Sequence, residues 1–139
     1  MAKVFEIKID RVELNEFFFK PRPKDLAVAT LVELNYNINV ANKVGPENSI
    51  IIQILRIDVT TKSNPTDILA SIGVSIGYLT KKFSEAVIYQ NGIYTVDSQL
   101  ELRLRNISIG TIRGMLISKL QGTYLHAGVL PIVPDTIIE

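Results

Sequence analysis

Stretches in which apolar and polar residues alternate constrain this sequence most strongly. In residues 27–41 the even positions are mainly apolar, whereas the odd positions include Glu33, Asn35, Asn37 and Asn39. A period of two sends the two sets of side chains to opposite faces of a strand, one buried and one solvated. Residues 4–19, 49–61 and 68–83 alternate in the same way or are rich in β-branched residues, so each predicts a further strand.

The segments between these strands are short and rich in turn residues. Residues 42–48 and 63–67 contain Asn, Pro and, in the first case, Gly, and residues 20–23 hold two prolines that end the first strand. Parallel neighbours need a crossover of about a dozen residues or more. The short turns therefore predict an antiparallel meander of four long strands.

A helical pattern replaces the alternation near the end of the chain. Apolar residues recur at intervals of three and four, at Ile109, Ile112, Leu116 and Leu120, and Gly122 is placed to end the helix. Its start stays open, because Asp97 is a candidate cap whereas the leucines at 100, 102 and 104 alternate like a strand. The sequence predicts an α+β fold in one domain, 1–139: a four-stranded antiparallel sheet packed with one long helix.

Composition excludes several kinds of function. The 139 residues carry 15 basic and 14 acidic side chains, a net charge of +1, which gives no case for nucleic-acid binding. The chain has no Cys and one His, which excludes disulfides, thiolate catalysis and Cys-based metal sites and argues against a His-rich metal site. We predict no metal site. With 47% hydrophobic and 21% charged residues, the chain is apolar for a soluble monomer, which indicates buried or shared surfaces.

Targeting and membrane signals are not evident in the sequence. Charges at positions 6, 8 and 10 interrupt the first apolar stretch, so it is not typical of a signal peptide. The longest uncharged run, residues 68–80, is too short for a bilayer, which requires about 20 residues. We therefore expect a cytoplasmic protein that does not insert into membranes.

One motif resembles catalytic machinery. Residues 73–77 match G-x-S-x-G, which in hydrolases places a nucleophilic Ser on a strand-to-helix turn and requires an acid and a His later in the chain. Here Ser75 lies inside an alternating segment, and the lone His126 has no evident orienting partner. Small residues that permit close backbone approach or a bulge in a long strand explain the motif better. We predict no catalytic residue and no enzymatic activity.

Two further features point to contact surfaces. Phe17, Phe18 and Phe19 are consecutive, so alternation puts Phe18 on the face opposite to the other two. In the helix, small residues recur every four positions at Gly110, Gly114 and Ser118. Glycine inside a helix costs about 1 kcal/mol relative to Ala, so a close neighbour should compensate. That neighbour is either another subunit or the chain's own sheet.

In this order along the chain, these elements resemble the SecB export-chaperone family. Residues 5–20 look like that family's first strand. Residues 111–124 are similar to its main helix and the segment that closes it, and residues 130–133 match the aliphatic–Pro–Val element that follows. The similarity covers nearly the whole chain.

The resemblance implies a chaperone that binds unfolded or extended apolar polypeptide, assembles as a dimer of dimers and uses no cofactor. Carried over by position, the client-binding candidates are Phe17, Phe19, Tyr78, Leu116, Leu120 and Tyr124. Gly110, Gly114 and Ser118 become candidates for the oligomer interface. An alternative is a non-catalytic structural or assembly subunit that reuses the fold and buries its apolar surface against a permanent partner.

Departures from the family's pattern bear on its partners. Family members that deliver clients to the export ATPase SecA are strongly acidic, whereas this chain is balanced and has Lys20 where an acid is expected. Loss of acidic charge weakens attraction to a basic partner. The sequence also contains no Cys, whereas the tail of the export chaperones binds zinc, so we do not expect such a tail. These differences argue against SecA docking, and SecB-like proteins that chaperone antitoxins are the natural relatives to consider.

Overall fold

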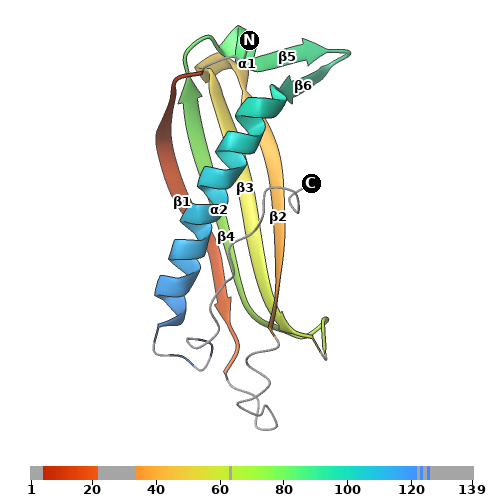
Figure 1. Ribbon diagram of the computed structural model, residues 1–139, viewed down its shortest axis with the longest axis vertical. Coiled ribbons are helices and arrows are strands. Elements are labelled where there is room, and N and C mark those ends of the chain that lie inside the picture. Colours follow the sequence, from red (N-terminus) through yellow and green to blue (C-terminus); the bar gives the residue numbers. More distant parts are fainter. Residues whose placement is uncertain (1–4, 22–33, 63, 122, 124, 126–139) are drawn as a thin grey trace.

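The computed structural model describes residues 5–21, 34–62, 64–121, 123 and 125. One face of a four-stranded antiparallel sheet is crossed diagonally by a single long helix (Figure 1). The sheet strands are β1 (Ile7–Phe19), β2 (Leu34–Gly45), β3 (Ile50–Thr61) and β4 (Ile68–Thr80), and the helix is α2 (Ser98–Leu120). Smaller elements are η2 (Pro46–Asn48), α1 (Phe83–Ala86), β5 (Val87–Gln90) and β6 (Ile93–Val96). The predicted α+β class is confirmed.

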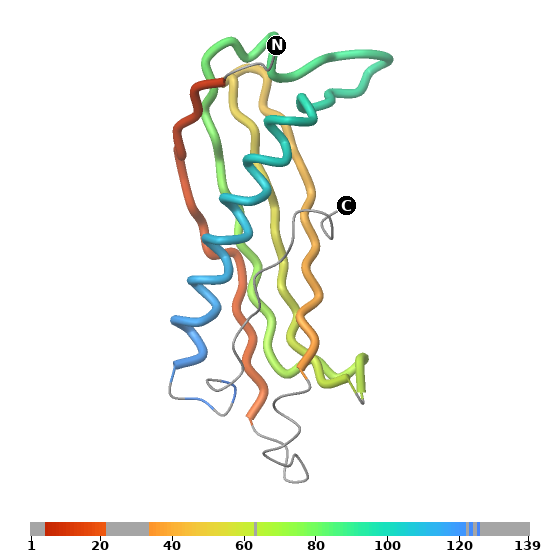
Figure 2. The backbone as a smooth tube through the Cα atoms, viewed as in Figure 1, coloured from red at the N-terminus to blue at the C-terminus, as the bar shows by residue number. Residues whose placement is uncertain are grey.

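The order of strands across the sheet is β1-β4-β3-β2. Strands β2, β3 and β4 form the predicted meander, and their paths run side by side in Figure 2. A simple meander would also put β1 beside β2, but β1 instead pairs with β4 from Ile7 opposite Thr80 to Phe19 opposite Ala70. As a result β1 and β2 are the two edges of the sheet.

Two strand ends differ from those expected from the sequence, and one pair of strands was not expected. Strand β2 continues to Gly45, beyond Ala41, and at Gly45 a Cβ atom would lie only 2.7 Å from Ile50 Cγ2 of the next strand. Strand β4 ends at Thr80, and Phe83 begins the short helix α1. Residues 87–96 form a second, two-stranded antiparallel sheet, the hairpin β5–β6, which the sequence analysis did not predict.

The start of helix α2 resolves the ambiguity left by its three leucines. Asp97 caps the helix, because its carboxylate accepts a hydrogen bond of 3.2 Å from the backbone N–H of Leu100. With helical spacing, Leu100 and Leu104 are buried and Leu102 is exposed. Leu102 therefore points away from the core, whereas a strand would place all three leucines on one face.

The hydrophobic core lies between the sheet and helix α2. Alternate residues of β3 and β4 face the helix. Tyr78 contacts α2, and every second residue of β4 from Tyr78, together with its paired residue on β3, lies on the same face of the sheet. Helix α2 contributes buried residues at intervals of three and four. The principal core side chains include Ile51, Leu55, Ile57, Ile72, Leu104, Ile112 and Leu116. Burial of each such side chain contributes about 1.5–3 kcal/mol to folding.

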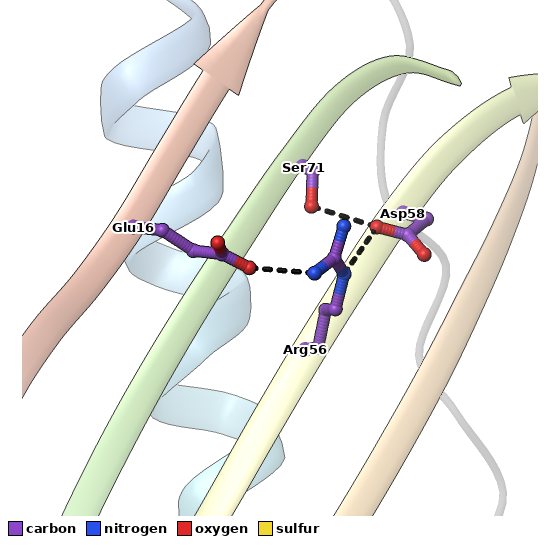
Figure 3. Close-up of polar contacts among 4 residues, drawn as sticks. All are labelled: Glu16, Arg56, Asp58 and Ser71. Carbon is purple, nitrogen blue, oxygen red and sulfur yellow. Dashed lines mark hydrogen bonds and ion pairs between the residues drawn. The ribbon is translucent and has the colours of Figure 1, made fainter. Parts of the chain in front are cut away.

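A polar network ties the strands together on the face of the sheet away from α2 (Figure 3). Arg56 donates to Asp58 Oδ1 at 2.9 Å and to Glu16 Oε1 at 2.7 Å, and Ser71 Oγ donates to Asp58 at 2.7 Å. Glu16 reaches Arg56 across β4 at Gly73, where a Cβ atom would lie 2.9 Å from Glu16 Cγ. Gly73, one of the two glycines around Ser75, therefore makes room for the Glu16 side chain, whereas the sequence predicted close approach of backbone or a bulge there.

Candidate functional site

Phe17 and Phe19 lie at the end of β1 that is nearest the last turn of α2 (Figure 1). Both side chains are half-buried and pack against the core, whereas Phe18, on the opposite face, is 50% exposed. The Lys119 ammonium group lies 5.9 Å from the centroid of the Phe17 ring, within cation–π range. The expected division of the three phenylalanines between two faces is confirmed, and the surface that Phe17 and Phe19 offer borders the helix.

Tyr78 is buried completely beneath α2. Its hydroxyl oxygen lies 2.6 Å from Ser108 Oγ and donates to the Leu104 carbonyl at 3.3 Å, and Ser108 donates to Gln53 Oε1 at 2.7 Å. Burial raises the pKa of Tyr78, and the hydrogen bond with Ser108 partly opposes this effect. Tyr78 is therefore neutral at pH 7, and its hydroxyl joins the sheet to the helix.

The network that begins at Tyr78 continues across the sheet. Gln53 Nε2 donates to Asn42 Oδ1 at 2.9 Å, and Asn42 Nδ2 donates to Glu101 Oε1 at 3.3 Å. Arg105 Nε donates to the same Glu101 oxygen at 2.9 Å. Side chains of β4, β3 and β2 are thus connected to two positions of α2. Tyr78, Gln53 and Ser108 are buried, and buried polar groups lose free energy when unpaired, so their contacts help to hold α2 against β3 and β4.

Of the other client-binding candidates, Leu116 and Leu120 are buried, with 1% and 5% of their surface exposed. Tyr124 lies outside the described residues. Phe17 and Phe19 pack against the same core that holds Leu116, Leu120 and Tyr78, but only the two phenylalanines retain exposed surface. The six-residue assignment stays a prediction, and the phenylalanines are the members that a client reaches without displacement of the core.

The row of small residues lies on the outer face of α2. Gly110, Gly114 and Ser118 are exposed, and a Cβ atom built at either glycine meets no heavy atom of the described residues within 4 Å. Packing of these glycines on the chain's own sheet, one of the two alternatives from the sequence, is therefore wrong for the part of the chain described. The other alternative, an interface with a second subunit, stays a prediction.

A row of apolar side chains along β1 is left uncovered. Ile9, Val12 and Leu14 are 45%, 43% and 42% exposed. They pair with Tyr78, Ile76 and Val74 of β4, which are buried against the helix, so they belong to the same side of the sheet. We call Ile9, Val12 and Leu14 the β1 apolar row. It continues toward Phe17 along one edge strand.

The hairpin β5–β6 carries a second exposed apolar surface, which the sequence analysis missed. Ile88, Tyr89, Ile93 and Tyr94 are all exposed, and the rings of the two tyrosines lie 4.6 Å apart between centroids. The available signal was the pair Asn91–Gly92 between two alternating runs, which is typical of a two-residue hairpin turn. Both residues have positive φ, of 53° and 78°.

Candidate catalytic groups do not come together in the described residues. Ser75 lies inside β4, where its hydroxyl accepts a hydrogen bond of 2.6 Å from the Asn15 amide, and His126 lies outside the described residues. Within residues 5–21, 34–62 and 64–121, no group of three or more His, Cys, Asp or Glu could hold a metal ion. Over the same ranges, no helix has the length and apolarity needed to cross a membrane.

Comparison with known proteins identifies the fold. No protein-family model matches the sequence, and no curated protein matches it. A solved structure, the Mycobacterium tuberculosis Rv1957 SecB-like chaperone in complex with a ChAD peptide from the Rv1956 HigA1 antitoxin, superimposes with a TM-score of 0.59. The alignment covers 92% of this chain and 88% of the Rv1957 chain at 12% identity. This chain has a SecB-like fold.

The exposed apolar surfaces occupy two places in this fold. They lie on the helix side of an edge strand and on a hairpin at the end of the sheet, not in a pocket lined by catalytic groups. Both surfaces offer apolar side chains for contact over an extended area. Charged side chains near the β1 apolar row are paired, as Arg11 is with Glu13 at 2.8 Å.

Proposed function

We propose that this chain is a SecB-like molecular chaperone that binds unfolded or extended apolar polypeptide in the cytoplasm. The observation that carries the proposal is the β1 apolar row, which α2 leaves uncovered and which leads to the half-buried Phe17 and Phe19. Contiguous exposed apolar surface is typical of interaction sites. The Rv1957 chaperone, with the same fold, was solved with an antitoxin peptide, which supports an antitoxin as one kind of client.

Charge contributes little to the proposed recognition. The net charge of the chain is +1, and Lys20, which replaces an expected acid, pairs with Asp67 at 2.6 Å. A neutral surface selects clients by their apolar content and does not attract a basic partner over long range. We therefore expect no docking on SecA, in contrast to the acidic export chaperones.

Suppression of aggregation tests the proposed function. A client protein diluted from denaturant should scatter less light when this chain is present in a small molar excess, because the β1 apolar row and Phe17 cover the client's exposed apolar side chains. A native protein that does not unfold is the control for nonspecific effects. Unchanged scattering at a tenfold molar excess would contradict the proposal and would favour a structural subunit.

We also propose that the chain forms a homo-oligomer, a dimer of dimers, through the outer face of α2. Gly110 and Gly114 have open space at their Cβ positions, so a second helix could approach closely there. The double substitution Gly110→Ala and Gly114→Ala should raise the stability of the folded monomer by about 1 kcal/mol per site, since Ala is the better helix former. The same methyl groups should reduce self-association at least tenfold if the row is an interface.

Analytical ultracentrifugation measures the assembly, and urea denaturation measures the stability. Ser98→Ala is the control, because Ser98 is exposed on the same helix but lies about 18 Å along the axis and about 120° around it from Gly110. An unchanged mass distribution for the double variant across the concentration range would remove Gly110, Gly114 and Ser118 from the interface.

A further inference from the structure

The turn of the hairpin β5–β6 consists of Asn91 and Gly92. Both residues are exposed and both have positive φ, of 53° and 78°, as a two-residue hairpin turn requires. A Cβ atom built at Gly92 meets no heavy atom of the described residues within 4 Å. In Figure 1 the hairpin extends beyond the top of β2, away from the rest of the sheet. The turn is therefore open to water.

Asn91 differs from the other asparagines of the sequence in the residue that follows it, because only Asn91 precedes a glycine. An asparagine side chain loses ammonia when the backbone nitrogen of the next residue attacks its carbonyl carbon. Glycine favours this reaction, since it has no side chain beside the attacking nitrogen and its backbone rotates freely. The Asn91 amide is therefore the asparagine amide of this chain that its own neighbour attacks most readily.

The reaction at Asn91 needs only the chain itself and water. The Gly92 nitrogen forms a bond to Cγ of Asn91, the Cγ–Nδ2 bond breaks, and ammonia leaves with the proton of the Gly92 N–H. Water then opens the succinimide ring at one of its two carbonyl carbons. Hydrolysis of the bond to Cγ gives aspartate. Hydrolysis of the bond to the backbone carbonyl carbon gives isoaspartate, in which the chain runs through Cγ.

Ring closure requires the turn to leave its present conformation. The positive φ of Asn91 belongs to a left-handed turn, and the side chain reaches the Gly92 nitrogen only after rotation about the Asn91 backbone. The strands of the hairpin are four residues each, and neither pairs with another described strand. Isolated two-stranded hairpins are marginally stable in water, so the turn opens often.

Side-chain packing adds little to the stability of the hairpin tip. The hairpin is held at its base, where Val87 is buried and the Asp97 N–H donates to the Ala86 carbonyl at 2.7 Å. Beyond Val87 its large apolar side chains are exposed, and Ile93 next to the turn is 64% exposed. Opening of the tip therefore exposes little additional apolar surface, while the base stays attached.

We propose that Asn91 is a site of deamidation and that its two products change the hairpin in different ways. Aspartate keeps the turn, because Asp–Gly suits it as Asn–Gly does, but it adds a negative charge to residues 86–96, which have none. Isoaspartate adds the same charge and lengthens the backbone by one carbon, which disturbs the pairing of Gln90 with Ile93. This inference does not depend on the proposed chaperone function.

Peptide mapping of the intact chain by mass spectrometry tests the inference. Trypsin cuts after Lys and Arg, so it releases residues 83–103, in which Asn91 is the only asparagine, and residues 106–113, in which Asn106 is the only one. Asn106 is the internal control, because it is exposed but lies within α2 and precedes Ile107. During incubation at neutral pH, a mass gain of about 1 Da should accumulate at Asn91 at least about tenfold faster than at Asn106.

The released peptide measures how far the hairpin protects the site. Fragment spectra assign the mass gain to Asn91, as distinct from Gln90 and Gln99, and separate aspartate from isoaspartate. The peptide of residues 83–103, incubated alone, should deamidate at most about a hundredfold faster than the intact chain. Equal rates at Asn91 and Asn106 in the intact chain, or protection greater than a hundredfold, would overturn the inference, because the folded turn would then not open.

Hydrogen exchange tests the different effects of the two products. Ion exchange separates the deamidated chain from the unmodified chain, and Asn91→Asp is the matched variant for the aspartate product. Backbone amides of residues 87–96 should exchange within about twofold of the unmodified rate in Asn91→Asp, and at least about threefold faster in the isoaspartate form. Equal exchange in the isoaspartate form and in Asn91→Asp would contradict the proposed change in pairing.

Discussion

Replacement of Leu104 by Ala should lower the free energy of unfolding by about 2–5 kcal/mol. Leu104 is completely buried between α2 and the sheet, and loss of its side-chain atoms removes apolar burial and leaves a cavity. The backbone carbonyl of the same residue accepts the hydrogen bond from Tyr78, so a shift of the helix to fill the cavity would strain that contact. Urea denaturation followed by far-ultraviolet circular dichroism measures the change.

Leu102→Ala is the control for this prediction. Leu102 lies two residues away on the same helix and is 39% exposed, so its loss should cost less than about 1 kcal/mol. The pair also separates the two interpretations of residues 100–104, because a strand would bury all three leucines equally. Equal losses at Leu102 and Leu104 would contradict the helix that begins at Ser98.

Replacement of Phe17 by Asp should weaken binding of unfolded polypeptide at least tenfold. Phe17 is half-buried beside Lys119, at the end of the β1 apolar row, and a carboxylate there would have to be desolvated by an apolar client. Fluorescence anisotropy with unfolded, carboxymethylated lactalbumin measures the affinity. Phe17→Ala adds no charge. It should therefore lower the affinity less than Phe17→Asp does, and it should also disturb the packing of the core less than Phe17→Asp does.

The neighbouring residue provides the control. Phe18 is 50% exposed on the other face of the sheet, so Phe18→Asp adds the same charge one residue away without touching the proposed surface. Its affinity for the client should stay within about twofold of the unmodified chain. A similar loss for both variants would mean that the client does not distinguish the two faces, and it would remove Phe17 from the proposed site.

The alternation of side chains predicted most of the sheet, because a strand that is buried on one face has apolar residues at every second position. It placed Phe17 and Phe19 apart from Phe18, as the structure confirms. Alternation did not predict which strand pairs with β1. Turn residues indicate that consecutive strands lie close together, but they do not exclude pairing of β1 with β4, which the structure shows. The long segment between β1 and β2 allows that arrangement.

The helix and the hairpin show two further limits. Leu100, Leu102 and Leu104 fit a strand by alternation, and the deciding interaction was local, the Asp97 side chain on the Leu100 N–H. The hairpin was missed because its strands are only four residues each, although Asn91–Gly92 signals its turn.

Candidate site residues were harder to predict than the strands, since a residue type does not reveal its exposed surface. Tyr78 was carried over by position from the family resemblance as a client contact, yet its alternation places it on the helix side of the inner strand β4, where its hydroxyl contacts Ser108. Conversely, Ile9, Val12 and Leu14 belong to the same face but are exposed, because the diagonal helix does not cover that part of β1. Coverage depends on the direction of the helix across the sheet, which the alternation within one strand does not reveal.

The central claim is that this SecB-like fold binds unfolded polypeptide in preference to native protein. Titration of the purified chain into labelled lactalbumin, once reduced and carboxymethylated and once native, tests it directly. We predict saturable binding of the unfolded form, with a dissociation constant at least tenfold lower than that for the native form. No binding of the unfolded form, or equal binding of both forms, would contradict the account.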